Sequence, residues 1–89
     1  MIIISYDIAN DKIRARFARM LTKIGAIRLQ FSVYELRNTN RITDNAKTKI
    51  EAFAKHFTPD DSVVIFEVEP NKLIKYGNTI HRDKSIVFF

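Results

Sequence analysis

The 89-residue sequence contains no cysteine and no tryptophan, and only two glycines and two prolines. Without cysteine the chain forms neither disulfides nor thiolate metal sites, which fits a reducing compartment, and we expect a cytoplasmic protein. The scarcity of glycine excludes a glycine-rich phosphate-binding loop. No apolar run approaches the ~20 residues of a membrane helix. No basic region precedes the apolar N-terminal residues, so we expect no signal peptide.

Positive charge is abundant and unevenly spread. The net charge is +5, and residues 1–37 carry seven Lys/Arg against three Asp/Glu, whereas residues 38–89 carry eight against seven. Such a surplus attracts polyanions through counterion release. A solvated surface on a basic protein is the competing explanation.

Hydrophobic periodicity predicts the elements of the first half. Residues 2–8 read as a buried strand. Asn10 or Asp11 caps a helix that runs to about Ile24 and ends at Gly25. Residues 27–36 are extended, and their length favours two short strands with a bend near residues 30–32. A polar loop over residues 37–42, a site for a hairpin tip, follows.

The second half reads as a helix and two strands. Thr43 is a suitable N-cap, Lys55 and His56 are expected in the last turn, and the buried face comprises Ala46, Ile50, Phe53, Ala54 and Phe57. A turn at residues 59–61 leads to a strand over residues 62–68. Residues 71–83 are irregular, and residues 84–89 read as a final strand.

This order of elements predicts one α+β domain over residues 1–89, a ferredoxin-like βαββαβ fold with an additional C-terminal strand. The last four residues, Ile86 to Phe89, are apolar. Soluble proteins avoid exposing such an edge strand. We therefore expect residues 84–89 to pair with a second subunit, and the protein to be a homodimer.

Asp7, at the end of the first predicted strand, is a candidate ligand for a hard cation. Magnesium is commonly held by one or two carboxylates, with waters and phosphate oxygens. Asp11 is committed to the helix start, so no second carboxylate nearby is suitable. In a two-fold dimer the other ligand would be the second copy's Asp7. The alternative is a carboxylate that accepts backbone hydrogen bonds or faces solvent.

Basic and aromatic side chains surround this strand end in the sequence. Arg14, Arg16, Arg19 and Arg28 are candidate nucleic-acid-binding residues, because guanidinium groups clamp phosphate with two parallel hydrogen bonds. Solvated arginines are the alternative. The aromatic residues of the predicted sheet could stack on bases, although core or interface packing is the commoner role; they are Tyr6, Phe31, Tyr34 and Phe66.

Four features follow one another along the chain: the run Tyr6-Asp7-Ile8, the basic helix, Gly25, and the run Arg28-Leu29-Gln30-Phe31-Ser32-Val33-Tyr34. Together they resemble the small CRISPR-associated spacer-acquisition protein family, whose members are commonly called endoribonucleases. The resemblance covers essentially the whole chain. It implies a ferredoxin-like homodimer in which Asp7 from both subunits binds a divalent metal, Mg²⁺. It also implies catalytic or nucleic-acid-contacting roles for Tyr6, Arg28 and Tyr34, the last replacing a more usual phenylalanine.

The resemblance further implies that the dimer binds protospacer double-stranded DNA and bridges the CRISPR-associated integrase during spacer integration. Two alternatives stay open. One is a metal-dependent nuclease on single-stranded RNA or on DNA. The other is a ferredoxin-like regulatory domain that binds a metabolite, for which this glycine-poor chain offers little support.

Overall fold

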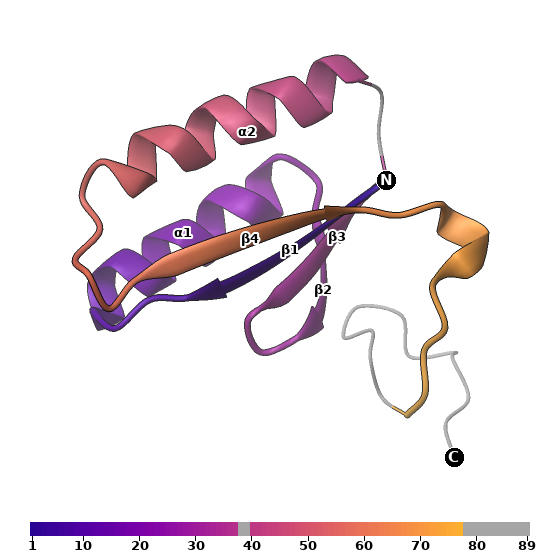
Figure 1. The fold of residues 1–89 in the computed structure, drawn as a ribbon, viewed down its shortest axis with the longest axis horizontal. Helices are drawn as coiled ribbons and strands as arrows, with labels where there is room; N and C mark the ends of the chain where they lie inside the picture. The colour runs from indigo at the N-terminus through magenta and orange to yellow at the C-terminus, as the bar shows by residue number, and fades with distance from the viewer. Residues whose placement is uncertain (38–39, 78–89) are drawn as a thin grey trace.

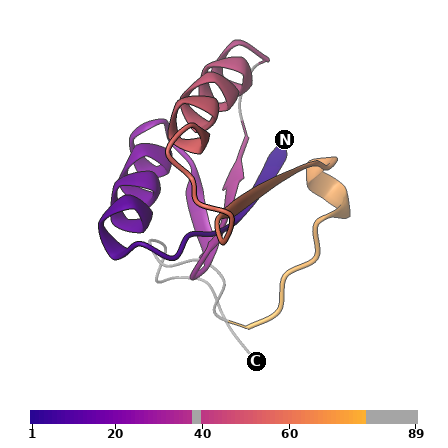
Figure 2. The same cartoon turned by 60° about the vertical axis from the view of Figure 1, so that its left-hand side comes forward.

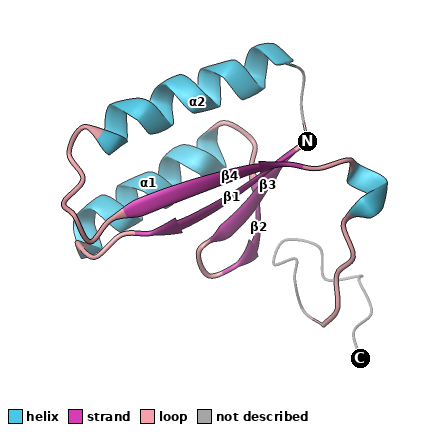
Figure 3. Ribbon diagram, in the orientation of Figure 1, coloured by secondary structure: helices cyan, strands magenta, loops and turns pink. Residues whose placement is uncertain are grey.

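The computed structural model describes residues 1–37 and 40–77. The elements in chain order are β1 (Ile2–Asp7), α1 (Asp11–Lys23), β2 (Ile27–Gln30), β3 (Val33–Leu36), α2 (Asn40–Ala54), β4 (Ser62–Glu67) and the short 3₁₀ helix η1 (Pro70–Lys72) (Figure 3). The strands form a four-stranded antiparallel sheet in the order β2-β3-β1-β4. This arrangement confirms the ferredoxin-like α+β prediction. The fifth strand predicted over residues 84–89 lies outside the described residues.

The two helices cover one face of the sheet (Figure 1), and the segment that follows β4 leaves toward the opposite side (Figure 2). Side chains of a strand alternate between faces. Ile2, Ile4 and Tyr6 of β1 point toward the helices and are at most 5% exposed. Tyr34 and Leu36 of β3 pair with Ile4 and Ile2 and are buried on the same side.

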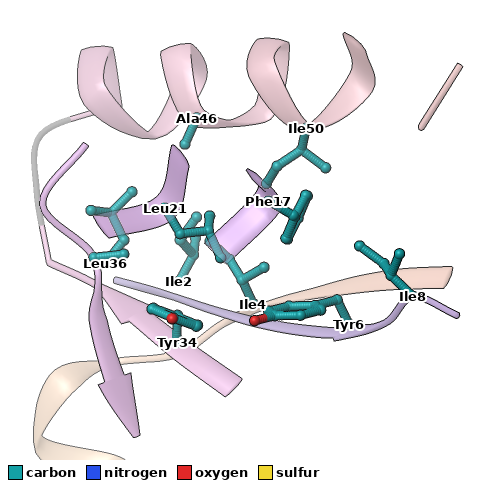
Figure 4. Close-up of a cluster of buried hydrophobic side chains, with 11 residues drawn as sticks. Ile2, Ile4, Tyr6, Ile8, Phe17, Leu21, Tyr34, Leu36, Ala46 and Ile50 are labelled. Carbon is teal, nitrogen blue, oxygen red and sulfur yellow. The ribbon is translucent and has the colours of Figure 1, made fainter. Parts of the chain in front are cut away.

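Both helices contribute to this core at helical spacing (Figure 4). Phe17 and Leu21 of α1 are fully buried, and Ala46 and Ile50 of α2 pack into the same cluster. The pairs lie four residues apart, which places each pair on one helical face. The ring of Phe17 meets the ring of Tyr6 edge-on, with a centroid distance of 4.8 Å. The buried face of α1 therefore passes through Phe17 and Leu21.

The ends of α1 form as the sequence predicted. The side-chain oxygen of Asn10 accepts a hydrogen bond of 3.0 Å from the backbone N–H of Ile13. Gly25 has φ 96°, a left-handed conformation that residues with a Cβ avoid. These two caps place β2 directly after the helix.

The second helix differs from the prediction at both ends. It begins at Asn40 rather than after Thr43, because Ile42 lies four positions before Ala46 and packs against the core. It ends at Ala54, so Lys55 and His56 lie in the following turn rather than in the last helical turn. Ala54 is exposed, contrary to its predicted burial, since the apolar stripe passes through Phe53 instead.

The strands are close to their predicted extents. β1 ends at Asp7 and β4 at Glu67, each one residue earlier than predicted. The predicted division of residues 27–36 is confirmed, with a turn at Phe31 and Ser32 between β2 and β3.

The segment after β4 covers part of the second face of the sheet. Ile3 and Leu29 are 9% and 6% exposed and line a cavity of about 360 Å³ together with Leu73 and Tyr76. Beside them Glu35 is 1% exposed and accepts hydrogen bonds of 2.7 Å from Lys75 and from Arg37. Burial raises the pKa of Glu35, but the hydrogen bonds and charges of Lys75 and Arg37 outweigh it, so the pKa falls below its ordinary value. Lys75 thus ties this segment to β3.

Asp61 joins the two loops at the other end of the sheet. Its carboxylate accepts 2.9 Å hydrogen bonds from the backbone N–H groups of Ala9 and Thr58. These bonds, with that to Ala9 contributing most, lower the pKa of Asp61. The bond to Ala9 fixes the turn that follows Asp7.

Replacing Glu35 with glutamine should destabilise the fold by about 2 kcal/mol, because two cations lose a buried charged partner. Urea unfolding at fixed protein concentration measures this. The matched control is Glu69→Gln, because Glu69 and Lys72 form an exposed ion pair at 3.6 Å. This control should cost less than about 0.5 kcal/mol. Equal losses of unfolding free energy in the two variants would contradict the role of Glu35 in holding Lys75 and Arg37.

Replacing Asp61 with asparagine should lower the melting temperature at neutral pH. Since the folded pKa of Asp61 is depressed, its contribution is fully present above the ordinary aspartate pKa of about 3.9. It disappears as the pH falls through the lower folded value. Thermal melts of both proteins between neutral and acidic pH check this, and a constant difference at every pH would count against it.

Candidate metal and nucleic-acid site

Asp7 is the last residue of β1 and its side chain is exposed. It pairs with Ser62 at the start of β4 and shares the face of Ile3 and Ser5, away from the helices. The turn that follows is held by Arg14, whose Nη1 donates a 3.1 Å hydrogen bond to the carbonyl of Ile8. The carboxylate of Asp7 is therefore presented to solvent on a fixed strand end.

The described part of the chain does not supply a complete metal site by itself. Across residues 1–37 and 40–77, no group of three or more His, Cys, Asp or Glu side chains could hold a metal ion. Asp7 alone meets only part of the oxygen set that magnesium prefers, one or two carboxylates with waters and phosphate oxygens. The carboxylate of Asp7 would suit a hard cation, but a magnesium site built on it would need further oxygen donors.

Tyr6 and Tyr34, two predicted catalytic residues, lie within the core (Figure 4). They are 5% and 4% exposed, and their rings stack with a centroid distance of 6.1 Å. Burial raises the pKa of Tyr6 to about 12, Tyr34 adds to the increase, and the charges of Arg28 and Arg14 oppose it. The hydroxyl of Tyr6 is therefore neutral near pH 7, which suits a hydrogen-bonding role rather than a base.

The four predicted phosphate-binding arginines fall into two groups. Arg14 and Arg28 lie near enough to Tyr6 to influence its pKa. Arg14 is partly committed, because it also pairs with Asp11 at the start of α1. Arg28 is exposed, and its guanidinium lies 5.1 Å from the ring centroid of Phe31, a cation–π geometry.

Arg16 and Arg19 form the second group, on the outer surface of α1. They are exposed and continue a row of cations at spacings of four, three and four, consisting of Lys12, Arg16, Arg19 and Lys23. Lys49 of α2 joins Arg16, Arg19 and Lys23 around a hollow of about 340 Å³. In the described part of the chain, no acidic side chain forms an ion pair with this group. The arrangement suits an anion.

The remaining sheet aromatics are exposed rather than buried. Phe31 at the β2–β3 turn is 69% exposed and Phe66 of β4 is 52% exposed. Val64, at 48% exposure, shares the Phe66 face of β4. Val64 was not among the predicted site residues, although the unbroken apolar run from residue 63 to residue 66 indicates a strand covered on both faces.

Sequence reasoning also missed Asp61 and Lys75, which hold the loops around the sheet. Their only signal was a charged residue in a turn or an irregular segment, which most often faces solvent. Of the two histidines in the sequence, His56 is exposed, and His81 lies outside the described residues. None of the helices in the described ranges is long and apolar enough to cross a membrane.

Comparison with known proteins agrees with this arrangement. The family model for "CRISPR associated protein Cas2" matches residues 1–76. Two relatives from different strains of Thermus thermophilus, named "CRISPR-associated endoribonuclease Cas2" and "CRISPR-associated endoribonuclease Cas2 1", are each 36% identical over 70 residues. Those matches span 70% of this chain and 73% of each relative.

A solved structure described as "Crystal structure of cas2" has the same fold, with a TM-score of 0.71 over 99% of this chain and 93% of the other, at 23% identity. The family match spans the strand-end aspartate, the basic helix and the whole described sheet. The chain therefore belongs to the CRISPR associated protein Cas2 family, as the run around Tyr6 and Asp7 had indicated.

Proposed function

We propose that this chain acts in CRISPR adaptation as a dimeric, cytoplasmic subunit that binds double-stranded DNA and bridges the integrase during new-spacer integration. The observation that carries the DNA-binding part is the row of α1 cations without acidic partners in the described residues. Exposed guanidinium and ammonium groups on one surface bind phosphates without reading sequence. Such a subunit accepts duplexes of any sequence, which spacer acquisition requires.

Dimerisation is supported by the exposed apolar side chains on and beside β4. Val64 and Phe66 are about half exposed on the face away from the helices, and Ile74 is 72% exposed. β4 is an edge strand of the described sheet, and exposed edge strands are normally covered. A second copy, whose residues 84–89 would add a strand, covers both features. It also brings a second Asp7.

A magnesium-dependent nuclease is the second candidate function, and it is compatible with the first. The relatives' names describe endoribonucleases, and the solvent-facing carboxylate of Asp7 favours this activity. Two Asp7 side chains, one from each copy, would hold Mg²⁺, which supplies phosphate polarisation and an activated water when bound. Arg28 and Arg14 would steady the charge that develops on the phosphate. Tyr6 would position these groups through its neutral hydroxyl, with the ring of Tyr34 stacked beside it.

Duplex DNA binding should depend steeply on salt. A dimer that contacts about six to eight phosphates gives a log–log slope of roughly −5 to −7. The double variant Arg16→Gln/Arg19→Gln removes four contacts from a dimer and should make the slope shallower by about three to four. Fluorescence anisotropy with a labelled duplex measures both.

The matched control, Arg41→Gln/Lys72→Gln, removes the same number of exposed cations outside the α1 row. Its slope should change by less than about one. A flat salt dependence of the unmodified protein, or equal losses in both double variants, would reject the assigned surface.

Replacing Asp7 with asparagine should abolish metal-dependent cleavage while leaving duplex affinity unchanged within about twofold. The carboxylate charge is lost at constant shape, which should lower the cleavage rate about 100-fold or more. Single-stranded RNA and double-stranded DNA are incubated with Mg²⁺ and with EDTA. Asp60→Asn, an exposed aspartate in a nearby turn, is the control and should retain activity. Cleavage that survives in Asp7→Asn would exclude this nuclease mechanism.

Co-purification with the integrase followed by a spacer-integration assay separates the two candidates. If Asp7→Asn supports integration, the structural role stands without cleavage. If the unmodified protein fails to associate with the integrase and still cleaves nucleic acid, the nuclease is the primary function.

A further inference from the structure

An apolar groove lies between the outer surfaces of α1 and α2, on the side of the helices away from the sheet. It has a volume of about 480 Å³, within the ~300–1,000 Å³ of ligand clefts. Its floor consists of Ile13 and Met20 from α1 and of Ala52 and Phe53 from α2. The ring of Phe53 meets the buried ring of Phe17 edge-on at a centroid distance of 5.3 Å. The floor is therefore anchored to the core.

The rim of this groove is basic. Arg16, Lys49 and His56 line it, and no acidic side chain does. Neither Arg16 nor Lys49 has an ion-pair partner in residues 1–37 or 40–77. An apolar floor with a cationic rim is complementary to a ligand that combines apolar groups with negative charge.

The groove continues into the basic hollow described above. Arg16, Met20 and Lys49 line both, so the two form one furrow between the helices, which run side by side in both Figure 1 and Figure 2. One part of the furrow has an apolar floor, and the other adds Arg19 and Lys23. We call this whole feature the helix furrow.

We infer that the helix furrow is a docking site for an acidic amphipathic segment of a partner protein. Apolar side chains of that segment would occupy the groove over Ala52 and Phe53, while its carboxylates would pair with Arg16, Lys49 and the cations beyond. Helices commonly bind this way, with anchors spaced three or four residues apart. The thioether of Met20 adapts readily to different side chains.

The apolar floor is what favours a peptide over a nucleic acid. A phosphate backbone satisfies the cations but leaves the surface over Ile13, Ala52 and Phe53 exposed to water. An acidic segment with apolar anchors covers both parts. This inference goes beyond the proposed DNA binding, because it needs the groove as well as the charge, and a variant that fills the groove separates the two.

The test uses the full chain and a synthetic fluorescein-labelled peptide with leucine and phenylalanine four positions apart among glutamates. A labelled polyglutamate of equal charge is the comparison probe. We expect the amphipathic peptide to bind saturably and at least about tenfold more tightly than polyglutamate. Equal binding of the two probes would overturn the inference, because charge alone would then explain the attraction.

Ala52→Arg fills the groove and adds a positive charge. It should lower the affinity for the amphipathic peptide at least about tenfold, while the affinity for duplex DNA should stay unchanged or increase. Ala54→Arg makes the same change at an exposed position of the same helix that does not line the groove. It should alter peptide binding less than about twofold. Tighter binding of both peptide and DNA to Ala52→Arg would instead identify a general polyanion surface and reject the docking site.

Circular dichroism establishes that both arginine variants fold. If Ala52→Arg does not fold, Lys49→Gln serves in its place, because Lys49 is exposed and lines both parts of the helix furrow. It should weaken the amphipathic peptide about two- to fivefold and reduce the salt dependence of binding. Unchanged peptide binding in Lys49→Gln would count against the inference.

Discussion

Strand β1 is hydrogen-bonded along both edges, to β3 on one side and to β4 on the other. Its two faces are buried against different layers, since Ile2 and Ile4 pack under the helices while Ile3 lies under the segment that follows β4. A strand with every edge and face occupied cannot shift by one residue without moving its apolar side chains to the wrong layer. The register of the whole sheet therefore depends on these interactions of β1.

The position of Asp7 is a consequence of that register. β1 ends at Asp7, which is exposed because neither the helices nor the segment after β4 covers it. Its neighbour Tyr6, which points to the opposite face, is buried. Asp61 and Arg14 then hold the turn that follows, through the N–H of Ala9 and the carbonyl of Ile8. A carboxylate on a fixed strand end, rather than on a loose loop, is the kind of placement that a metal site needs.

Much of this arrangement could be predicted from local sequence patterns. The apolar run of β1, the Asn10 cap and Gly25 are strong local signals, and each element appears where its signal lies. The start of α2 was harder, because Ile42 joins the apolar stripe within a segment that otherwise reads as a polar loop. Its end was misplaced because Ala54 alone does not reveal which side of a helix it occupies.

The long-range polar contacts could not be predicted in the same way. Glu35 reads as an ordinary strand residue, and its burial depends on Lys75, forty positions later. The separation of Arg14 and Arg28 from Arg16 and Arg19 likewise requires the three-dimensional arrangement. Four arginines close in sequence suggest one phosphate surface, whereas helical geometry directs Arg14 toward the strand end and Arg16 outward.

The outward-facing cations of α1 repel one another and so destabilise the isolated chain. Lys12 with Arg16, and Arg19 with Lys23, are like charges at four-residue spacing, and each such pair destabilises a helix by about 0.2–0.5 kcal/mol. Elsewhere in the described chain, Glu67 pairs with Lys47 and Glu35 pairs with Lys75. Lysines at other places in this fold thus have acidic partners, whereas the row of cations on α1 has none among the described residues. A polyanion bound to these unpaired cations would reduce the repulsion between them. Binding of the polyanion would therefore also stabilise the folded chain.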